Sequence, residues 1–424
     1  MCRKSGLRGE TPLGDAWRPT RFGQFRMKPL ADRTTRISTS QTVAIDAKYK
    51  ALKAQGKDVL SLGAGEPDLD TPAHAKQAAI DSITQGLTKY SMVTGMPALK
   101  EAVSRKFERE NGLAYPPADI IISSGAKHAV FNALLALVQE GDEVVIPSPC
   151  WVTYPELVRF LGGTPIMLPA PIEAGFRATA AQIEKAVTPR TKLVIFNSPG
   201  NPTGAVYPEA DLRAIAAVIV KQDLYCLADE IYEHIVYEGS RHVSIASLGP
   251  EIFARTITIN GMSKAFAMTG WRIGYTGAPA PLAAAIGAIQ SHGTHHPANA
   301  SQYAAAAALV DDKGFPALLR GHLAACRALT LERLAAIPGL KVFPPEGAFY
   351  AFFNVEAYLG KSHGGKTIKN SFDLCEYLLE AQLLATVPGS AFGAEGFMRI
   401  SFANELGILA RALDRLAAGL ANLR

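Results

Sequence analysis

The sequence contains few cysteines, and their spacing argues against two kinds of site. There are five in 424 residues, an odd number, and none belongs to a Cys-x-x-Cys pair. Disulfide frameworks and structural zinc sites both use cysteines at paired, close spacings. We therefore expect no metal site and a reducing compartment, and so a cytoplasmic location.

Long apolar runs are also absent. No window approaches the roughly eighteen apolar residues that a membrane-spanning helix needs, so we expect no membrane partner. Residues 1–26 are rich in glycine, proline and arginine and lack the apolar stretch of a signal peptide. A transit peptide fits poorly, because serines are few and acids are present. We expect a disordered tail or an overextended start, since Met27 opens a segment that looks like a natural N-terminus.

An excess of charge is confined to one end of the chain. The formal net charge is +5, but residues 1–26 hold six basic and two acidic residues, so the remainder is close to neutral. A nucleic-acid-binding surface would need a basic face, so we expect no nucleic-acid partner. With 48% hydrophobic and 19% charged residues, the composition is that of a globular protein long enough for two domains.

The sequence does contain an alternation of β-rich and helical runs between about residues 118 and 275. Candidate helices at 129–138 and 208–222 alternate with candidate strands at 119–123, 143–147, 192–196, 224–228 and 256–260. This alternation predicts an α/β fold with a mostly parallel sheet covered on both faces. After about residue 310, a helical stretch at 316–336 and later strands and helices fit a smaller α+β domain, with an exposed loop at 359–371.

Unusual residues follow each candidate strand. In open α/β sheets, ligands bind outside the carboxyl ends of the strands. The five strands are followed by SGAK (124–127), SPCW (148–151), NSPGNPTG (197–204), DEIY (229–232) and GMSK (261–264). Each signal is weak alone, but together they predict one composite site at this edge of the sheet.

The first of these segments suits an anion. Backbone N–H groups of Gly125, Ala126 and Lys127 at a helix start could hold a phosphate, although Ser124 could equally be a simple helix cap. The stretch SKAFAMTGWRIGY, residues 263–275, could add a hydroxyl from Ser263 and a guanidinium from Arg272 to the same anion.

Two further residue types complete the pattern. Asp229 follows an apolar run and needs a cationic partner, either Arg272 or a protonated ring nitrogen of a cofactor. Lys264, at a crowded strand end, is a candidate for a lowered pKa and a Schiff base. With the indole of Trp151 to stack on a ring, these groups together describe a site for pyridoxal 5′-phosphate.

Five segments carry a resemblance to a known family. SKAFAMTGWRIGY, NSPGNPTG, DEIYEHIVY, LGAGEPDLDTP and TKYSMVTGMPALKEAV resemble the class I aminotransferases of pyridoxal-phosphate fold type I, and look closest to the bacterial aspartate aminotransferase branch. The resemblance runs in matching order from about Met27 to the C-terminus. It implies a large cofactor-binding domain at 62–309, a small domain at 310–424 that residues 27–61 join, and a homodimer.

The resemblance also implies roles for single residues. Lys264 would form the Schiff base and then move the substrate proton, and Asp229 would pair with the ring nitrogen. Asn201 and Tyr232 would hydrogen-bond the 3′-oxygen of the cofactor, while Trp151 would stack on its ring.

The phosphate and the substrate have their own implied partners. The phosphate would be held by Gly125, Ala126, Lys127, Ser263 and Arg272, with Tyr90 from a neighbouring subunit. Arg399 would grip the substrate α-carboxylate as a bidentate fork, and Gly65 would line the substrate pocket. The implied reaction moves the amino group of an L-amino acid, aspartate or an aromatic one, to 2-oxoglutarate in a ping-pong cycle.

Four residues bear on the choice of substrate. Lys127 stands where the branch has a lysine that can meet a distal carboxylate, though it could also be a solvated helix residue. Cys150 replaces the usual tyrosine before Trp151, and His295 and His296 replace small hydroxyl residues. We hypothesise that these histidines shift the donor range; interface packing is the alternative.

Other functions fit the same sequence less well. A carbon–sulfur β-lyase would share the cofactor residues. A non-catalytic cofactor-binding regulatory domain would need a fused DNA-binding domain, for which residues 1–26 are too short. A nicotinamide dehydrogenase would need a Gly-x-Gly-x-x-Gly motif, which LGAGEPD matches only in part.

Overall fold

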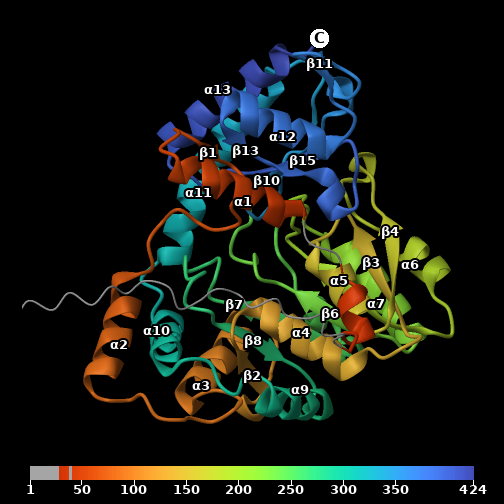
Figure 1. Ribbon diagram of the computed structural model, residues 1–424. Helices are drawn as coiled ribbons and strands as arrows, with labels where there is room; N and C mark the ends of the chain where they lie inside the picture. The colour runs from red at the N-terminus through yellow and green to blue at the C-terminus, as the bar shows by residue number, and fades with distance from the viewer. Residues whose placement is uncertain (1–27, 38–40) are drawn as a thin grey trace, which may run out of the picture.

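The computed structural model describes residues 28–37 and 41–424, so the expectations for residues 1–26 and Met27 lie outside it. A seven-stranded sheet forms the centre, in the order β2-β8-β7-β6-β5-β3-β4 (Figure 1). Its strands are β2 (Ile120–Ser123), β3 (Glu143–Ser148), β4 (Thr164–Pro169), β5 (Thr191–Asn197), β6 (Tyr225–Asp229), β7 (Thr256–Gly261) and β8 (Gly274–Gly277). Neighbours from β4 to β7 pair in parallel, and β8 is antiparallel to both of its neighbours.

Helices cover both faces of this sheet, as the strand pattern requires. Alternate residues of a strand point to opposite faces: Leu193 and Ile195 pack in one apolar cluster, and Val194 and Phe196 in another. The first cluster includes α4 (Ala126–Leu137), α5 (Thr153–Phe160) and α9 (Ala280–His292), and the second α6 (Ala180–Ala186), α7 (Glu209–Lys221) and α8 (Pro250–Phe253). The mixed α/β fold with a mostly parallel central sheet is confirmed.

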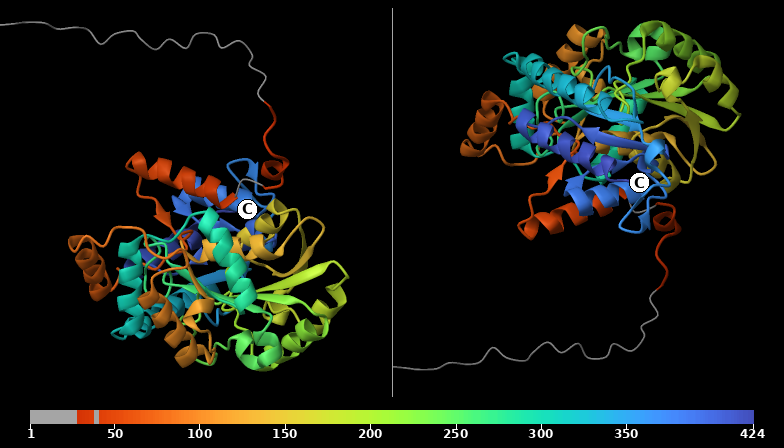
Figure 2. Two further views of the ribbon diagram at one scale, coloured as in Figure 1. Left: turned by 90° about the horizontal axis from the view of Figure 1, so that it is seen from below. Right: turned by 90° about the horizontal axis from the view of Figure 1, so that it is seen from above.

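A second, antiparallel sheet has the order β14-β15-β10-β9. Its strands are β9 (Lys341–Val342), β10 (Tyr350–Asn354), β14 (Val387–Pro388) and β15 (Phe397–Ser401), and the helices in this part are α1 (Gln41–Ala54), α11 (Phe315–Ala335), α12 (Ser371–Gln382) and α13 (Leu406–Ala421). Strand β1 (Leu60–Ser61) pairs in parallel with β13 (Leu384–Ala385), and α1 lies beside α12 (Figures 1 and 2). Segments 41–61 and 371–385, far apart in the sequence, thus meet here, although the domain boundaries stay a prediction.

Helix α10 (Asn299–Val310) packs against α2 (Ala73–Thr84) and α3 (Pro97–Lys106). A π-helical turn, η2 (Phe107–Asn111), continues α3. Within the expected loop at 359–371 lies a short hairpin of β11 (Ser362–His363) and β12 (Lys366–Thr367). Among the helices of the described residues, none is long and apolar enough to cross a membrane.

Candidate active site

A cavity of about 470 Å³ lies at the carboxyl ends of the central strands and is also lined by Tyr350 and Arg399 of the second sheet. Its lining contains most of the residues that the sequence singled out, together with several that it did not. The lining residues are Ala64, Gly65, Glu66, Ala126, Lys127, Trp151, Tyr154, Asn197, Asn201, Asp229, Ile231, Tyr232, Ser263, Lys264, Thr269, Arg272, Tyr350 and Arg399. The strand ends therefore converge, because parallel strands end at one edge of a sheet.

Lys264 follows β7 and extends its amine into this cavity. Its Nζ donates to the carbonyl oxygen of Gly65 and lies 5.8 Å from the centre of the Tyr232 ring. Burial, reinforced by the positive charge of Arg399, lowers the pKa of Lys264 to about 8. A fraction of this amine is therefore neutral near physiological pH, as a nucleophile or a base requires.

Asp229 ends β6 and is almost fully buried, with 3% of its surface exposed. The Tyr154 hydroxyl donates to its Oδ2 at 2.7 Å, and the Ile231 amide donates to its Oδ1 at 3.3 Å. Burial raises the pKa of Asp229 to about 6, although the Tyr154 hydroxyl opposes the rise. No cation of the described residues forms an ion pair with this carboxylate, so Arg272 is not its partner.

The start of α4 and the loop before β8 form an anion-sized cradle. Gly125 has φ of +91°, and a Cβ there would collide with the guanidinium of Arg272. Arg272 is fixed by its own donation to the carbonyl oxygen of Thr269 at 2.8 Å. The amides of Ala126 and Lys127, in the first turn of the helix, have no intrahelical acceptor. Backbone donors and a guanidinium therefore meet where a phosphate would fit.

Arg399, on β15, is buried opposite this cradle. Its Nη2 donates to the carbonyl oxygen of Gly63 at 2.7 Å, its Nη1 donates to Oδ1 of Asn201 at 3.1 Å, and its buried Nε has no hydrogen-bond partner. The guanidinium stacks over the Tyr350 ring at 4.5 Å, and the Tyr350 hydroxyl lies 2.9 Å from that of Tyr232. A buried guanidinium without an acidic partner is suited to binding a carboxylate.

Lys127 is also directed toward the cavity. Its Nζ lies 5.0 Å from the centre of the Trp151 ring, and burial, followed by the charge of Arg272, lowers the pKa of this amine. The residue as a whole is exposed, and its ammonium lies over the indole of Trp151, which also lines the cavity.

Four of the predicted residues are not among those that line the cavity: Gly125, which adjoins the lining residue Ala126, and Tyr90, His295 and His296. Tyr90 is 90% exposed. Its ring centre lies 5.2 Å from that of His295 and 6.0 Å from that of His296, and the two imidazoles are 5.0 Å apart. His296 accepts a hydrogen bond from the Ser91 amide at 3.0 Å. These three rings form one group outside the lining of the cavity.

Sequence reasoning missed two tyrosines of the site. Tyr154 lies one helical turn after Trp151, and the two rings meet edge to face at 5.3 Å, so spacing from Trp151 was an available signal. Tyr350 lies on β10, where Phe352 pairs with Arg399. Residues two apart share a face of a strand, so the register between β10 and β15 brings Tyr350 close to Arg399. The sequence alone does not give that register.

Comparison with known proteins agrees with this geometry. Residues 57–416 match the family described as aminotransferase class I and II. The chain is 47% identical over 390 residues to an aspartate aminotransferase of Rhizobium meliloti (strain 1021), covering 92% of this chain and 95% of the relative. It is 44% identical over 392 residues to an aspartate/prephenate aminotransferase of Nitrosomonas europaea, covering 92% and 99%.

Solved structures show the same likeness. The crystal structure of the Rhizobium meliloti aspartate aminotransferase matches with a TM-score of 0.90 at 46% identity, over 94% of this chain and all of the other. An aspartate aminotransferase from Thermus thermophilus with maleate matches with a TM-score of 0.87 at 41% identity, over 93% of this chain and all of the other. The chain therefore belongs to the class I and II aminotransferases and is an enzyme that transfers amino groups.

Proposed function

We propose that this aminotransferase uses pyridoxal 5′-phosphate to move the amino group of L-aspartate to 2-oxoglutarate. One observation carries the proposal: a single cavity holds a buried carboxylate, Asp229, an amine of lowered pKa, Lys264, and a buried guanidinium, Arg399. Each of these charges is costly to bury without a partner, and one cofactor with one amino acid would supply all the partners.

The residues of the cavity fit this cofactor at both of its ends. The cradle of Gly125, Ala126, Ser263 and Arg272 offers backbone, hydroxyl and guanidinium donors to a phosphate. Asp229 would meet a protonated ring nitrogen, which is the cation that its carboxylate lacks. The phosphate end and the ring end of the cavity therefore both match.

The substrate-facing part of the ring would have three more neighbours. Trp151 would stack on the ring, and Asn201 and Tyr232 would donate to its 3′-oxygen. All three line the cavity. Tyr350 then holds the Tyr232 hydroxyl in place at 2.9 Å.

When bound, pyridoxal 5′-phosphate supplies an electrophilic carbonyl carbon and a cationic ring that withdraws electrons from the substrate Cα. Asp229, as a carboxylate, would keep the ring nitrogen protonated. Lys264 would provide the amine that holds the cofactor and would take the proton from the substrate Cα as a general base. Its pKa of about 8 suits this task near neutral pH.

The charges of the cavity support a dicarboxylic substrate. Arg399 would bind the α-carboxylate of both donor and acceptor as a fork, using the unpartnered Nε beside Nη. Lys127 is a second cation lining the same cavity and would meet the distal carboxylate that L-aspartate and 2-oxoglutarate share. The two relatives are named aspartate aminotransferase and aspartate/prephenate aminotransferase. An aromatic amino acid is the second candidate for the donor.

A homodimer is part of the proposal. Tyr90 is 90% exposed, and Ile83 and Met92 are 59% and 53% exposed, so this edge offers apolar surface to a second copy. Tyr90 of one subunit would then reach the phosphate of the other. His295 and His296 would lie beside it and would shift the range of amino donors. The test compares kcat/KM for aspartate and for phenylalanine in His295→Ala and in His296→Ala; an unchanged ratio in both variants would contradict this role.

The rival reactions are less well supported. The relatives are named aminotransferases, and the match extends over 95% and 99% of their length. This match does not favour a carbon–sulfur β-lyase or a non-catalytic binding domain. Four described cysteines are free and buried, which supports the cytoplasm as the location.

The test begins with the purified protein and added pyridoxal 5′-phosphate. A visible absorption band is expected, and L-aspartate should bleach it while releasing oxaloacetate, with 2-oxoglutarate restoring it. Lys264→Ala should give no such band after dialysis. A band that survives in Lys264→Ala, or pyruvate release from a cysteine conjugate without any oxo acid, would overturn the proposal.

A further inference from the structure

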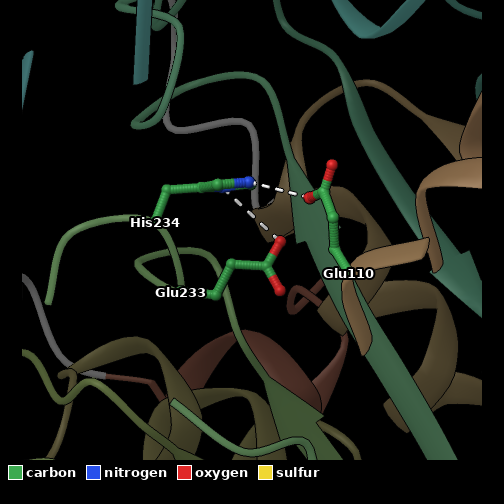
Figure 3. A group of neighbouring side chains, drawn as sticks. All are labelled: Glu110, Glu233 and His234. Atoms are coloured by element: carbon green, nitrogen blue, oxygen red, sulfur yellow. Dashed lines mark hydrogen bonds and ion pairs between the residues drawn. The ribbon is translucent and has the colours of Figure 1, made fainter. Parts of the chain in front are cut away.

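A group of charged side chains that ranges from exposed Glu110 to buried Glu233 lies beside the turn that follows β6 (Figure 3). Glu110, Glu233 and His234 bring their oxygen and nitrogen atoms within 4.8 Å of one another, and so do Glu230, Glu233 and His242. Figure 3 shows His234 directed at both of its carboxylates, with His234 Nε2 2.9 Å from Oε2 of Glu110. Glu233 is common to both groups and follows Tyr232 in the chain, so it connects this cluster to the active site.

The cation of this cluster is a lysine of the same chain. The Lys106 ammonium donates to Oε1 of Glu233, and the two side chains are 1% and 5% exposed. Asn260 also donates to Oε1 at 2.6 Å, and Asn111 donates to Oε2 at 2.6 Å. Three donors therefore occupy the Glu233 carboxylate, which leaves it unsuited to a metal ion.

The charge of Glu233 is held firmly. Burial alone would raise the pKa of this carboxyl, but the Lys106 ammonium, with His234 and His242, lowers it to about 2. Glu233 is thus a carboxylate at any pH at which an enzyme works. An ionised, fully bonded side chain has a fixed position, which is what a positioning residue needs.

The π-helical turn explains how Lys106 and Asn111 reach the same carboxylate. Lys106 ends α3, and Asn111 ends η2 five residues later. A π-helix bonds residues five apart, so these two side chains lie one above the other, and Lys106 Nζ donates to Oδ1 of Asn111 at 2.7 Å. The unusual turn therefore presents two donors together to Glu233.

Glu233 ties together the two turns that carry the proposed catalytic groups. Its amide donates to the carbonyl oxygen of Glu230 at 2.9 Å, which closes the turn that directly follows Asp229, the last residue of β6. Asn260, which donates to its carboxylate, also accepts from the Gly261 amide at 2.7 Å, at the start of the turn that leads to Lys264. A single carboxylate thus links the Asp229 turn to the Lys264 turn.

We propose that Glu233, anchored by Lys106, is a positioning residue that fixes the Lys264 amine relative to Asp229 and Tyr232. The inference rests on the proposed use of pyridoxal 5′-phosphate. Displacements of about 1 Å in an active site can reduce rates about a hundredfold, so a link between the two turns has catalytic weight. The alternative is that the ion pair only stabilises the fold.

A matched carboxylate separates the two roles. Glu143 is also 5% exposed and is also paired with a basic residue, Arg190, whose Nε donates to it at 2.9 Å, but Arg190 is 71% exposed whereas Lys106 is 1% exposed. It begins β3, at the opposite end of that strand from the cavity. Glu143→Gln therefore removes a buried, paired carboxylate without touching the site, whereas Glu233→Gln removes one beside it.

The experiment compares the two variants with the wild type, all loaded with pyridoxal 5′-phosphate. Thermal midpoints, the pH midpoint of the visible band, the dissociation constant of the cofactor, and kcat and KM for L-aspartate are measured. Both variants should melt earlier. Only Glu233→Gln should shift the pH midpoint of the band, weaken the cofactor and lower kcat about tenfold or more with little change in KM.

Asn260→Ala provides a second test if Glu233→Gln fails to fold. It breaks the link to the Lys264 turn but leaves the Lys106–Glu233 pair in place, and it should shift the band midpoint in the same direction. An unshifted midpoint and an unchanged kcat in Glu233→Gln, or in Asn260→Ala where the first does not fold, would overturn the inference. Absence of any visible band in the wild type would instead overturn the proposed cofactor, so the two failures are distinct.

Discussion

Replacing Tyr154 by phenylalanine tests how the site controls the charge of Asp229. The Tyr154 hydroxyl donates to the carboxylate at 2.7 Å, and both side chains are buried. The substitution removes only the hydroxyl, so the edge contact of the ring with Trp151 is kept. Asp229 then loses its side-chain donor and keeps the Ile231 amide.

The magnitude follows from the strength of that hydrogen bond. A hydrogen bond to a charged group contributes about 1.5–3 kcal/mol, and about 1.36 kcal/mol corresponds to one pKa unit. Without it, the pKa of Asp229 should rise from about 6 by about one to two units. Only the ionised carboxylate can pair with the ring nitrogen of the cofactor, so below this pKa the apparent affinity falls about tenfold for each pH unit.

The assay is the dissociation constant of pyridoxal 5′-phosphate across the pH range. The ratio of Tyr154→Phe to wild type should be near one at about pH 9 and should reach about tenfold or more at about pH 5.5. Titrations of the cofactor itself are common to both proteins and cancel in this ratio. Tyr207→Phe is the control, because that buried hydroxyl bonds the Ala178 amide instead, at 2.9 Å. A ratio that does not vary with pH would refute the reasoning.

Three further substitutions probe the ligand-binding groups. Arg399→Lys keeps the charge but loses the fork, so KM for both L-aspartate and 2-oxoglutarate should rise about tenfold or more in steady-state assays; an unchanged KM would remove Arg399 from carboxylate binding. Lys127→Met keeps an unbranched apolar side chain but removes the ammonium that lies over the indole. The value of kcat/KM should therefore fall about tenfold for L-aspartate and stay constant for L-phenylalanine; equal losses would contradict a distal-carboxylate role. Gly125→Ala places a Cβ against Arg272 and should weaken the cofactor, whereas Gly141→Ala, at the same φ of +91° with nothing within 4 Å of its Cβ, should only lower the thermal midpoint.

The central strands could be predicted because they are buried on both faces. The predicted strand at 192–196 lies within β5 (Thr191–Asn197), and the predicted strand at 256–260 lies within β7 (Thr256–Gly261). Such strands are continuous apolar runs bounded by polar residues. The prediction missed β4 (Thr164–Pro169), which is an edge strand with two prolines, and β8 (Gly274–Gly277), which has glycine at both ends.

The candidate site divides along similar physical lines. Groups that follow a strand directly, such as Asp229 and Lys264, could be placed from the sequence, because the ends of parallel strands share one edge. Tyr350 could not, because its approach to Arg399 depends on the pairing register of β10 with β15. Glu233 could not either, since its partners Lys106 and Asn111 lie more than a hundred residues away in the chain.

The stretch from Ser263 to Tyr275 orients two cationic side chains, Lys264 and Arg272. Ala267 and Arg272 have φ of +50° and +58°, a region that non-glycine residues seldom occupy and that costs about 1 kcal/mol or more per residue. The surrounding contacts hold this conformation: Arg272 donates to the Thr269 carbonyl, and Gly125 leaves room for its guanidinium. A loop in relaxed conformations would carry the two cations in other directions. The strain is therefore tied to the arrangement in which Lys264 and Arg272 both line the cavity, with Arg272 forming part of the anion cradle beside Gly125.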